Sequence, residues 1–277
     1  FDHADIFSSL AEIQTSFRHL INIVPRNGLL LANADDANLV PLLGIDHCPV
    51  RRFGLGDNSD DLASGLDFSE SGSEFRLGDT TFRIPMIGEL NVRNALAALL
   101  LARYTGLSDE QVQSGFDTFK GIQRRMEIRG ETGGVTVIDD FAHHPTAIRE
   151  TLKALGQRYP GRRVWAIFEP RSNTTRRNHF QVELAEALRL AKRVVVAEIA
   201  RLEQVPEDER LDPARLMEDI RTAGTEADYL PSADEIVTHV TAKAEPGDIL
   251  CVLSNGGFGN IHQKLLAALA ERSTKKL

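Results

Sequence analysis

The chain has 277 residues, of which 42% are hydrophobic and 26% charged. This composition excludes intrinsic disorder and leaves room for two domains with hydrophobic cores. The formal net charge of -8 comes wholly from residues 1–122, which hold 9 Lys and Arg against 17 Asp and Glu, because residues 123–277 hold 23 of each. A nucleic-acid-binding protein normally carries a basic stripe, so we expect no nucleic-acid partner.

The sequence also bears on location. No stretch approaches the roughly 18 apolar residues of a membrane span, so we expect no membrane partner. Cys48 and Cys251 are neither a disulfide framework nor a metal-ligand pair, which favours a reducing cytoplasm. The chain begins Phe1-Asp2-His3, without a methionine, a basic leader or an apolar signal core. We therefore expect a cytoplasmic protein without a targeting peptide, and a sequence that is part of a longer protein.

Residues 1–122 alternate between helical and extended patterns. Apolar residues at helical spacing predict a helix over about 6–24, which Pro25 and Gly28 end. Strands are predicted over 28–33 and 50–55, with a short helix over 35–43 between them and a hairpin over about 75–82 after them. An almost wholly apolar helix over 91–104, which we expect to be buried, precedes a helix over 109–119 with Ser108 as its N-cap.

Residues 123–277 show a more regular alternation. Continuous apolar strands are predicted over 135–139, 164–168, 194–198 and 249–253, and helices over about 146–158, 178–191, 212–223, 233–244 and 260–272. Such strands are typical of a parallel sheet with helices on both faces. The predicted fold class is therefore α/β, with a Rossmann-like, mostly parallel domain after a first α/β domain.

Polar segments follow three of the predicted strands. Residues 139–145 read DDFAHHP, residues 169–177 read EPRSNTTRR, and residues 254–260 read SNGGFGN. Ligands of open α/β sheets bind at the carboxyl ends of the strands. We therefore expect the three segments to share one edge of the sheet and to form a site there.

The first of these segments has two interpretations. Asp140 could orient a ribose, while His143 and His144 donate to phosphate or substrate oxygens. Alternatively, Asp140 or Thr146 caps the next helix and the histidines are satisfied surface groups. We favour a functional site, because the whole group lies at a strand end. Zinc is not favoured, since neighbouring histidines diverge and no third ligand is placed.

Arginines and asparagines supply further candidates. Arg171 could hold an acidic substrate through two parallel hydrogen bonds, or belong to a solvated basic loop. Asn91 and Asn94, three residues apart on one helix face, could read a purine edge or merely cap the helix. Arg124 and Arg125 are either linker charges or reach a phosphate between the domains.

Several common motifs are missing. The sequence holds no GxxxxGK[ST] phosphate-binding loop, no GxSxG elbow and no HExxH pair. The glycine-rich turn after Leu253 is not GxGxxG, which counts against a nicotinamide oxidoreductase. That class remains an alternative, because fold does not fix function.

Six segments occur in fixed order: Asp2-His3 near a helix start, GELNVRNALAA, RRMEIRGE, VTVIDDFAHHP, FEPRSNTTRR and SNGGFGNIHQKL. Over the whole chain this order resembles the Mur ligases, the ATP-dependent amide ligases of peptidoglycan synthesis. The resemblance implies that residues 1–122 are the end of a central ATP-binding domain and residues 123–277 a C-terminal domain. It places a UDP-sugar domain and the phosphate-binding loop upstream of Phe1. It also implies ATP and Mg²⁺ as cofactors and an acyl phosphate on the way to the amide bond.

The resemblance also implies roles for individual residues. His3 corresponds to the magnesium-associated histidine, with Asp2 beside it. Asn91 and Asn94 correspond to adenine contacts, Arg125 to the arginine that reaches the ATP phosphates, and Asp140 to the acid that holds the ribose. A further set would face the amino substrate and the acyl group, with His143 in a catalytic role and the others binding substrate: His143, His144, Arg171, Arg176, Ser254 and Asn255.

Within the family, FDHADIF, EPRSNT and SNGGFG look most like members that join the wall tripeptide L-Ala-γ-D-Glu-meso-diaminopimelate to UDP-N-acetylmuramate during recycling. The alternatives are the members that add L-alanine to UDP-N-acetylmuramate, and a non-catalytic protein that binds wall peptide. Because the phosphate-binding loop is missing, we expect the 277 residues alone to fold without catalysing. The oligomeric state stays open.

Overall fold

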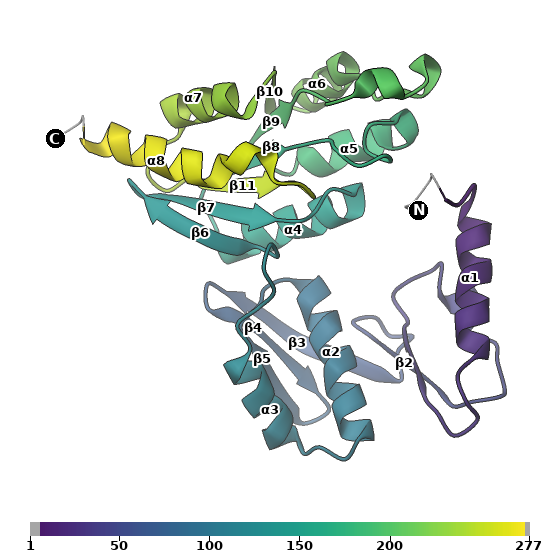
Figure 1. Cartoon of the computed structure of the whole chain (residues 1–277). Coiled ribbons are helices and arrows are strands. Elements are labelled where there is room, and N and C mark those ends of the chain that lie inside the picture. The colour runs from purple at the N-terminus through teal and green to yellow at the C-terminus, as the bar shows by residue number, and fades with distance from the viewer. Residues whose placement is uncertain (1–5, 275–277) are drawn as a thin grey trace. The chain divides into compact units, whose positions relative to one another are not determined.

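A computed structural model describes residues 6–274 of the chain (Figure 1). The described residues form two compact units, and the chain passes from the first to the second between Lys120 and Gly121. Each unit has its own sheet and its own hydrophobic core. Among the described residues, no helix combines the length and the apolar character needed to cross a bilayer.

The first unit contains a five-stranded sheet in the order β1-β2-β3-β4-β5. The first three strands are parallel and the last three form an antiparallel meander. The hairpin expected over 75–82 is confirmed as the second half of this meander. The bounds are β1 (Leu30–Asn33), β2 (Val50–Gly54), β3 (Asp61–Ser69), β4 (Gly72–Leu77) and β5 (Thr80–Ile84).

The first helices of this unit differ from their predictions. Helix α1 (Leu10–Asn22) is shorter than the helix expected over about 6–24. Its N-cap is Ser9, whose hydroxyl accepts a hydrogen bond from the backbone N–H of Glu12. The helix expected over 35–43 is wrong: turns occupy most of it, and only a 3₁₀ turn, η1 (Val40–Leu42), is regular. The cause is local, since the Asp36 side chain accepts from the N–H of Asn38 and so favours a turn.

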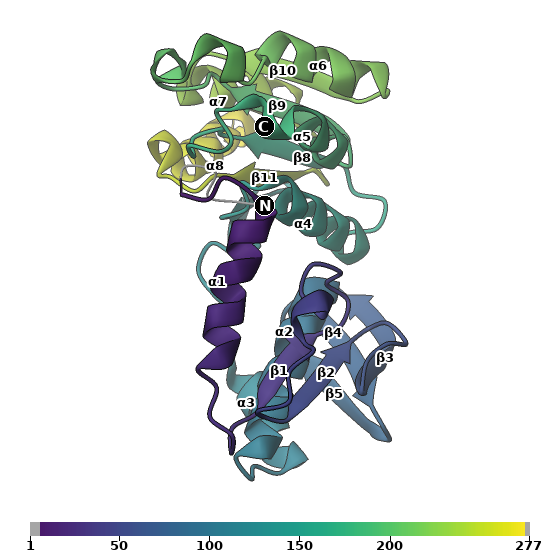
Figure 2. The ribbon, with the colours of Figure 1, turned by 90° about the vertical axis from the view of Figure 1, so that its right-hand side faces the viewer.

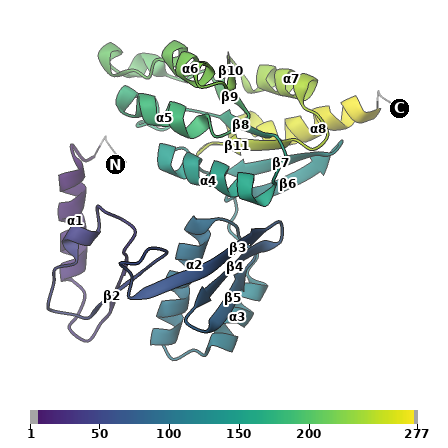
Figure 3. The same ribbon diagram turned by 180° about the vertical axis from the view of Figure 1, so that it is seen from behind.

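Helices α2 (Glu89–Tyr104) and α3 (Asp109–Thr118) cover the sheet of the first unit, as Figure 3 shows from behind. Helix α2 buries one stripe but leaves Leu90 and Leu101 about half exposed. The expectation of burial on every face is therefore wrong. Helix α3 begins with the predicted Ser108 cap, which forms a reciprocal pair of hydrogen bonds with Gln111.

The second unit contains a six-stranded sheet in the order β10-β9-β8-β11-β7-β6. All neighbouring pairs are parallel except β6 with β7. The mostly parallel sheet is therefore confirmed, and two edge strands that the sequence did not predict, β6 and β10, complete it. The bounds are β6 (Glu127–Thr132), β7 (Val135–Asp140), β8 (Val164–Phe168), β9 (Arg193–Ala197), β10 (Glu226–Leu230) and β11 (Ile249–Leu253).

Five helices cover the two faces of this sheet (Figure 2). One face packs on α4 (Pro145–Arg158), α5 (Gln181–Leu188) and α6 (Pro213–Thr222), and the other on α7 (Ala233–Lys243) and α8 (Ile261–Thr274). Successive strand residues point to opposite faces. In β7, for example, Ile138 lies in the hydrophobic cluster on the side of α4, α5 and α6, and Val137 lies in the cluster on the side of α7 and α8.

The order of the strands brings the three polar segments together. Strand β11 lies between β7 and β8, so the chain leaves all three strands at the same edge. The N–H of Ser254 donates to the carbonyl of Asp140 at 3.1 Å, and the N–H of Glu169 donates to the carbonyl of Leu253 at 3.0 Å. The expected common edge is therefore confirmed.

Candidate functional site

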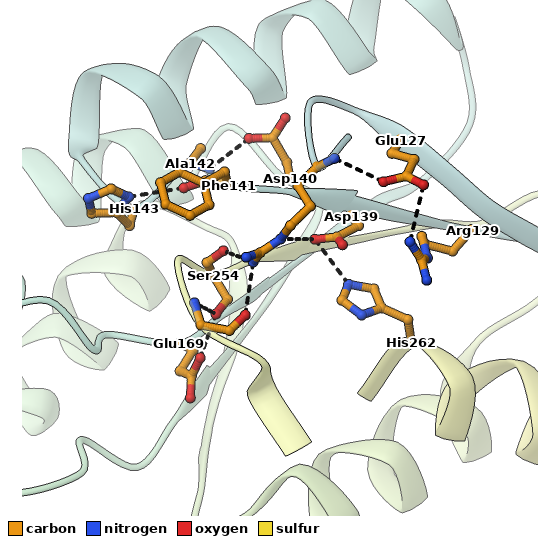
Figure 4. Close-up of polar contacts among 12 residues, drawn as sticks. Glu127, Arg129, Asp139, Asp140, Phe141, Ala142, His143, Glu169, Ser254 and His262 are labelled. Atoms are coloured by element: carbon orange, nitrogen blue, oxygen red, sulfur yellow. Dashed lines mark hydrogen bonds and ion pairs between the residues drawn. The ribbon is translucent and has the colours of Figure 1, made fainter. Parts of the chain in front are cut away.

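The two acids of the DDFAHHP segment point to opposite faces of the sheet, because they are consecutive residues at the end of β7. Asp139 faces α8, where its Oδ1 lies 3.3 Å from Nε2 of His262. Asp140 faces α4, where its Oδ1 accepts from the hydroxyl of Thr151 at 3.3 Å. Figure 4 shows Asp139 beside His262 and Asp140 beside Ala142. The segment is therefore not one cluster of acids and imidazoles.

Asp140 is buried, with 3% of its surface exposed. Oδ1 also accepts from the N–H of Ala142 at 2.7 Å, and Oδ2 accepts from the N–H of Met126 at 2.8 Å. Burial raises the pKa of Asp140, and these hydrogen bonds only partly offset that effect. In this arrangement Asp140 ties the chain before β6 to the end of β7, and both its oxygens already have partners.

The two histidines use their Nδ1 atoms in opposite ways. Nδ1 of His143 lies 3.0 Å from the carbonyl oxygen of Phe141. Because a carbonyl only accepts, this bond assigns the proton to Nδ1 and leaves the lone pair on Nε2 of the neutral ring. His144 instead accepts from the N–H of Thr146 at 3.2 Å and is the N-cap of α4. The cap is therefore neither Asp140 nor Thr146.

Arg124 and Arg125 have different surroundings. Arg124 is partly buried, and its Nη2 donates to the carbonyl oxygens of Ser254 at 2.5 Å and Gly256 at 2.9 Å. Arg125 is exposed, with its guanidinium 5.7 Å from the centre of the Phe141 ring. Both neighbours of Arg125 have left-handed backbone, with φ of 58° at Arg124 and 47° at Met126. Such strain in non-glycine residues often marks a functional site.

Ser254 is fully buried, so its hydroxyl does not face solvent. It donates to Oε2 of Glu169 at 2.5 Å and accepts from the N–H of Gly256 at 2.9 Å. The role that fits these contacts is support of the loop rather than contact with a substrate. Asn255 is half-buried, and its side-chain oxygen accepts no hydrogen bond from the described part of the chain. The oxygen atom is itself buried, so this loop contains a buried acceptor without a partner among the described residues.

Arg171 and Arg176 also differ. The side chain of Arg171 is 57% exposed and its Nη1 lies 4.0 Å from Oε1 of Glu169. Arg176 donates from Nη2 to the side-chain oxygen of Asn173 and from Nη1 to the carbonyl of Arg201 at 3.3 Å. Arg176 therefore joins two loops, whereas Arg171 keeps donors for a ligand.

In the first unit, the N-cap of α2 is Gly88, so neither candidate asparagine is the cap. Asn91 donates from Nδ2 to the carbonyl of Ile87 at 2.8 Å, which leaves its side-chain oxygen as an acceptor, and Asn94 is exposed. The start of α2 is fixed by Asp35, which accepts from Arg93 at 2.8 Å. Burial raises the pKa of Asp35, but the hydrogen bonds from Arg93 and two backbone N–H groups outweigh it and leave that pKa lowered.

His3 and Asp2 lie outside the described residues, so the structure says nothing of the predicted magnesium contact. Among the described residues, no group of three or more His, Cys, Asp or Glu side chains could hold a metal ion.

Glu169, His262 and Gly256 were not predicted as site residues. Glu169 is the first residue after β8, which is a positional signal that the sequence offered. His262 gave no comparable signal, because its partner Asp139 is 123 positions away in the chain.

Two family models match the chain. The Mur ligase middle domain matches residues 1–102, and the Mur ligase glutamate ligase domain matches residues 124–256. The class of protein that the fold and the two matches define is therefore an α/β protein built from the middle and C-terminal domains of the Mur type. The chain belongs to the Mur ligase family.

Individual relatives agree with this assignment. The UDP-N-acetylmuramate–L-alanyl-γ-D-glutamyl-meso-2,6-diaminoheptandioate ligase of Escherichia coli is 36% identical over 277 residues, which is 99% of this chain and 58% of the relative. The UDP-N-acetylmuramate–L-alanine ligase of Acetivibrio thermocellus is 32% identical over 96% of this chain and 57% of the relative.

Among solved structures, the murein peptide ligase of Psychrobacter arcticus superimposes with a TM-score of 0.68 at 34% identity, covering 95% of this chain and 56% of that protein. The chain thus spans somewhat more than half the length of the relatives it matches.

Proposed function

We propose that this chain is part of an ATP-dependent ligase that joins L-Ala-γ-D-Glu-meso-diaminopimelate to UDP-N-acetylmuramate in peptidoglycan recycling. The proposal is supported by the 36% identity to a relative named for that tripeptide. It is also supported by the two domain matches, which together reach from residue 1 to residue 256.

The observation that carries the proposal lies at one edge of the second sheet. Three groups able to bind or react are accessible there: exposed Arg125, exposed Arg171 and half-buried His143. The residues behind them, such as Arg124 and Ser254, are occupied in holding the loops. Catalysis requires reactive side chains that a ligand can reach, and neighbouring residues that hold those side chains in place.

His143 is suited to accept a proton. Amide bond formation needs the amine of the incoming peptide as a free base, since an ammonium group has no lone pair with which to attack. The bond from Nδ1 to the Phe141 carbonyl leaves the lone pair on Nε2. We assign the removal of the ammonium proton to Nε2 of His143, as general base.

Arg171 is suited to recognise the tripeptide. That peptide carries several carboxylates, whereas L-alanine carries one, and a guanidinium binds a carboxylate through two parallel hydrogen bonds. More than half of the Arg171 side chain faces solvent. Arg176 is less available than Arg171, because two of its donors already bond to Asn173 and Arg201.

Each unit by itself offers groups that suit ATP. In the first unit, the side-chain oxygen of Asn91 and the exposed amide of Asn94 can hydrogen-bond to a purine. In the second unit, exposed Arg125 can bind phosphate. When bound, ATP supplies the phosphoryl group that turns the muramyl carboxylate into an acyl phosphate. Both oxygens of Asp140 already accept hydrogen bonds from the protein, and Oδ2 accepts only one, from Met126, which leaves it able to accept another from a ribose hydroxyl. Residues 6–274 contain no group of three or more His, Cys, Asp or Glu side chains that could hold a metal ion, and we assign no step to Mg²⁺.

The test measures phosphate release by the full-length gene product in the presence of ATP, Mg²⁺ and UDP-N-acetylmuramate. The tripeptide is the amino substrate in one assay, and L-alanine is the amino substrate in the other. The proposal predicts release with the tripeptide. Release only with L-alanine would move the protein to the biosynthetic step, and silence with both would favour a non-catalytic peptide-binding protein. A His143→Gln variant should lower kcat with the tripeptide, because the proposed general base is gone.

A further inference from the structure

Gly256 lies against the side chain of Arg171. A Cβ atom built on Gly256 would lie 2.6 Å from Nη1, 2.7 Å from Cδ and 2.9 Å from Cζ of Arg171. Non-bonded carbon atoms reach their optimum at roughly 3.5–4.0 Å, so any side chain at this position displaces the arginine. The backbone of Gly256 is not left-handed. Conformation alone therefore does not require glycine here.

The loop under Arg171 is held at three points. The N–H of Gly256 donates to the hydroxyl of Ser254 at 2.9 Å. Its carbonyl oxygen accepts from Nη2 of Arg124 at 2.9 Å, and the same Nη2 donates to the carbonyl of Ser254 at 2.5 Å. Arg124 is itself held by Asp139, whose Oδ1 lies 3.5 Å from Nε. The glycine is thus part of a fixed platform.

Glu169 limits the arginine on another side. Its Oε1 lies 4.0 Å from Nη1 of Arg171, and its Oε2 accepts from Ser254. The Glu169 side chain is 17% exposed and that of Arg171 is 57% exposed. A guanidinium has five donors, so a single carboxylate at this distance leaves donors for a second anion. The arginine is oriented by its neighbours without being saturated by them.

We propose that Gly256 is a specificity-determining position. Because Gly256 has no side chain, Arg171 can pack directly against it, and in this position the guanidinium binds a carboxylate of the peptide substrate. The proposal rests on the proposed function, since it takes the tripeptide as the ligand. Arg124, Ser254 and Glu169 are positioning residues in it, because they act on the ligand only through Gly256 and Arg171.

The chain offers a matched pair of variants for the test. In Gly256→Ala the new methyl group displaces Arg171, whereas in Gly257→Ala it meets nothing within 4 Å. Gly257 has φ of -83° and ψ of -12°, which alanine adopts without strain. A displacement of about 1 Å can reduce a rate or an affinity by up to about 100-fold. We expect Gly256→Ala to raise KM for the tripeptide about tenfold or more, while its kcat and its melting temperature stay near the wild-type values. Gly257→Ala should match wild type in KM, kcat and melting temperature.

A double-mutant cycle in the full-length gene product separates the mechanism from loop damage. In the Arg171→Ala background the proposed clash no longer exists, so adding Gly256→Ala should change neither KM nor the dissociation constant of the tripeptide. Additive losses would overturn the inference. So would a lowered melting temperature of Gly256→Ala that persists without Arg171, because the strain would then come from the loop itself.

The outcomes also separate this inference from the function on which it rests. Wild-type protein that does not ligate or bind the tripeptide rejects the proposed function, and the inference with it. Wild-type protein that ligates the tripeptide while Gly256→Ala and Gly257→Ala behave alike rejects the inference alone.

Discussion

Nη2 of Arg124 donates to the carbonyl oxygen of Gly256 at 2.9 Å, which joins two segments that are 132 residues apart in the chain. Its neighbour Arg125 is exposed and lies between two residues with left-handed backbone. Of these two adjacent arginines, Arg124 therefore holds a loop, whereas Arg125 faces solvent.

The first prediction concerns stability. Arg124→Ala removes hydrogen bonds from a charged donor and leaves buried Asp139 without its guanidinium partner. We expect a loss of about 2 kcal/mol in the free energy of unfolding, measured by urea denaturation. Arg125→Ala is the control and should change this free energy by less than about 0.5 kcal/mol. Equal losses of unfolding free energy in Arg124→Ala and Arg125→Ala would contradict the conclusion that only Arg124 holds the loop.

The second prediction concerns turnover. Arg125→Ala in the full-length gene product should lower kcat by about 100-fold, as expected when a charge that faces the reacting phosphate is removed. Affinity for UDP-N-acetylmuramate, measured by calorimetry, should stay near wild type. Unchanged turnover would show that Arg125 does not face the reacting groups.

The third prediction concerns Ser254. Because Ser254 is fully buried and bonds to Glu169 and Gly256, Ser254→Ala should destabilise the fold by about 1–3 kcal/mol, the cost of unpaired buried polar groups. It should also raise KM for the tripeptide, through the displacement of Gly256. Weaker tripeptide binding at unchanged stability would instead indicate direct contact between Ser254 and the substrate.

The fourth prediction concerns acid stability. Asp248 is 3% exposed and accepts from Arg163 twice at 2.8 Å and from the indole of Trp165 at 2.9 Å. Burial raises the pKa of Asp248, but these bonds outweigh it and leave that pKa below the ordinary 3.8. The stabilisation is therefore fully present above about pH 4 and is lost as pH falls through the folded-state pKa.

Asp248→Asn should then cost about 3 kcal/mol at pH 7, because it leaves Arg163 without its buried partner. The difference from wild type should shrink below about pH 4. Asp234→Asn is the control, since Asp234 pairs with Lys264 at the surface and its side chain is 78% exposed. The free energy of unfolding is measured by circular dichroism in urea. If the difference between wild type and Asp248→Asn is the same at pH 7 and pH 3, the ionised carboxylate of Asp248 is not what stabilises the fold.

The central strands of the second sheet could be predicted because they are buried on both faces. Strands β8 and β11 have only buried residues and read as continuous apolar runs, and both have their predicted bounds. The edge strands β6 and β10 were missed because each has a neighbour on one side only and carries exposed polar residues, such as Arg129 and Glu226.

The location of the site could also be predicted, but not the direction of its side chains. Parallel topology requires the segments after β7, β8 and β11 to share an edge. Whether Ser254 faces solvent or the core depends on partners such as Glu169, 85 positions away. The opposite directions of Asp139 and Asp140 follow from strand alternation, but only once the end of β7 is known to include both.

The central claim is that the full-length protein is a ligase that selects the tripeptide. The most direct measurement is a competition in one tube: ATP, Mg²⁺ and UDP-N-acetylmuramate with equal concentrations of L-Ala-γ-D-Glu-meso-diaminopimelate and L-alanine, followed by mass spectrometry of the products. We predict that UDP-N-acetylmuramyl-tripeptide is the main product. Accumulation of UDP-N-acetylmuramyl-L-alanine, or the absence of both products, would contradict the claim.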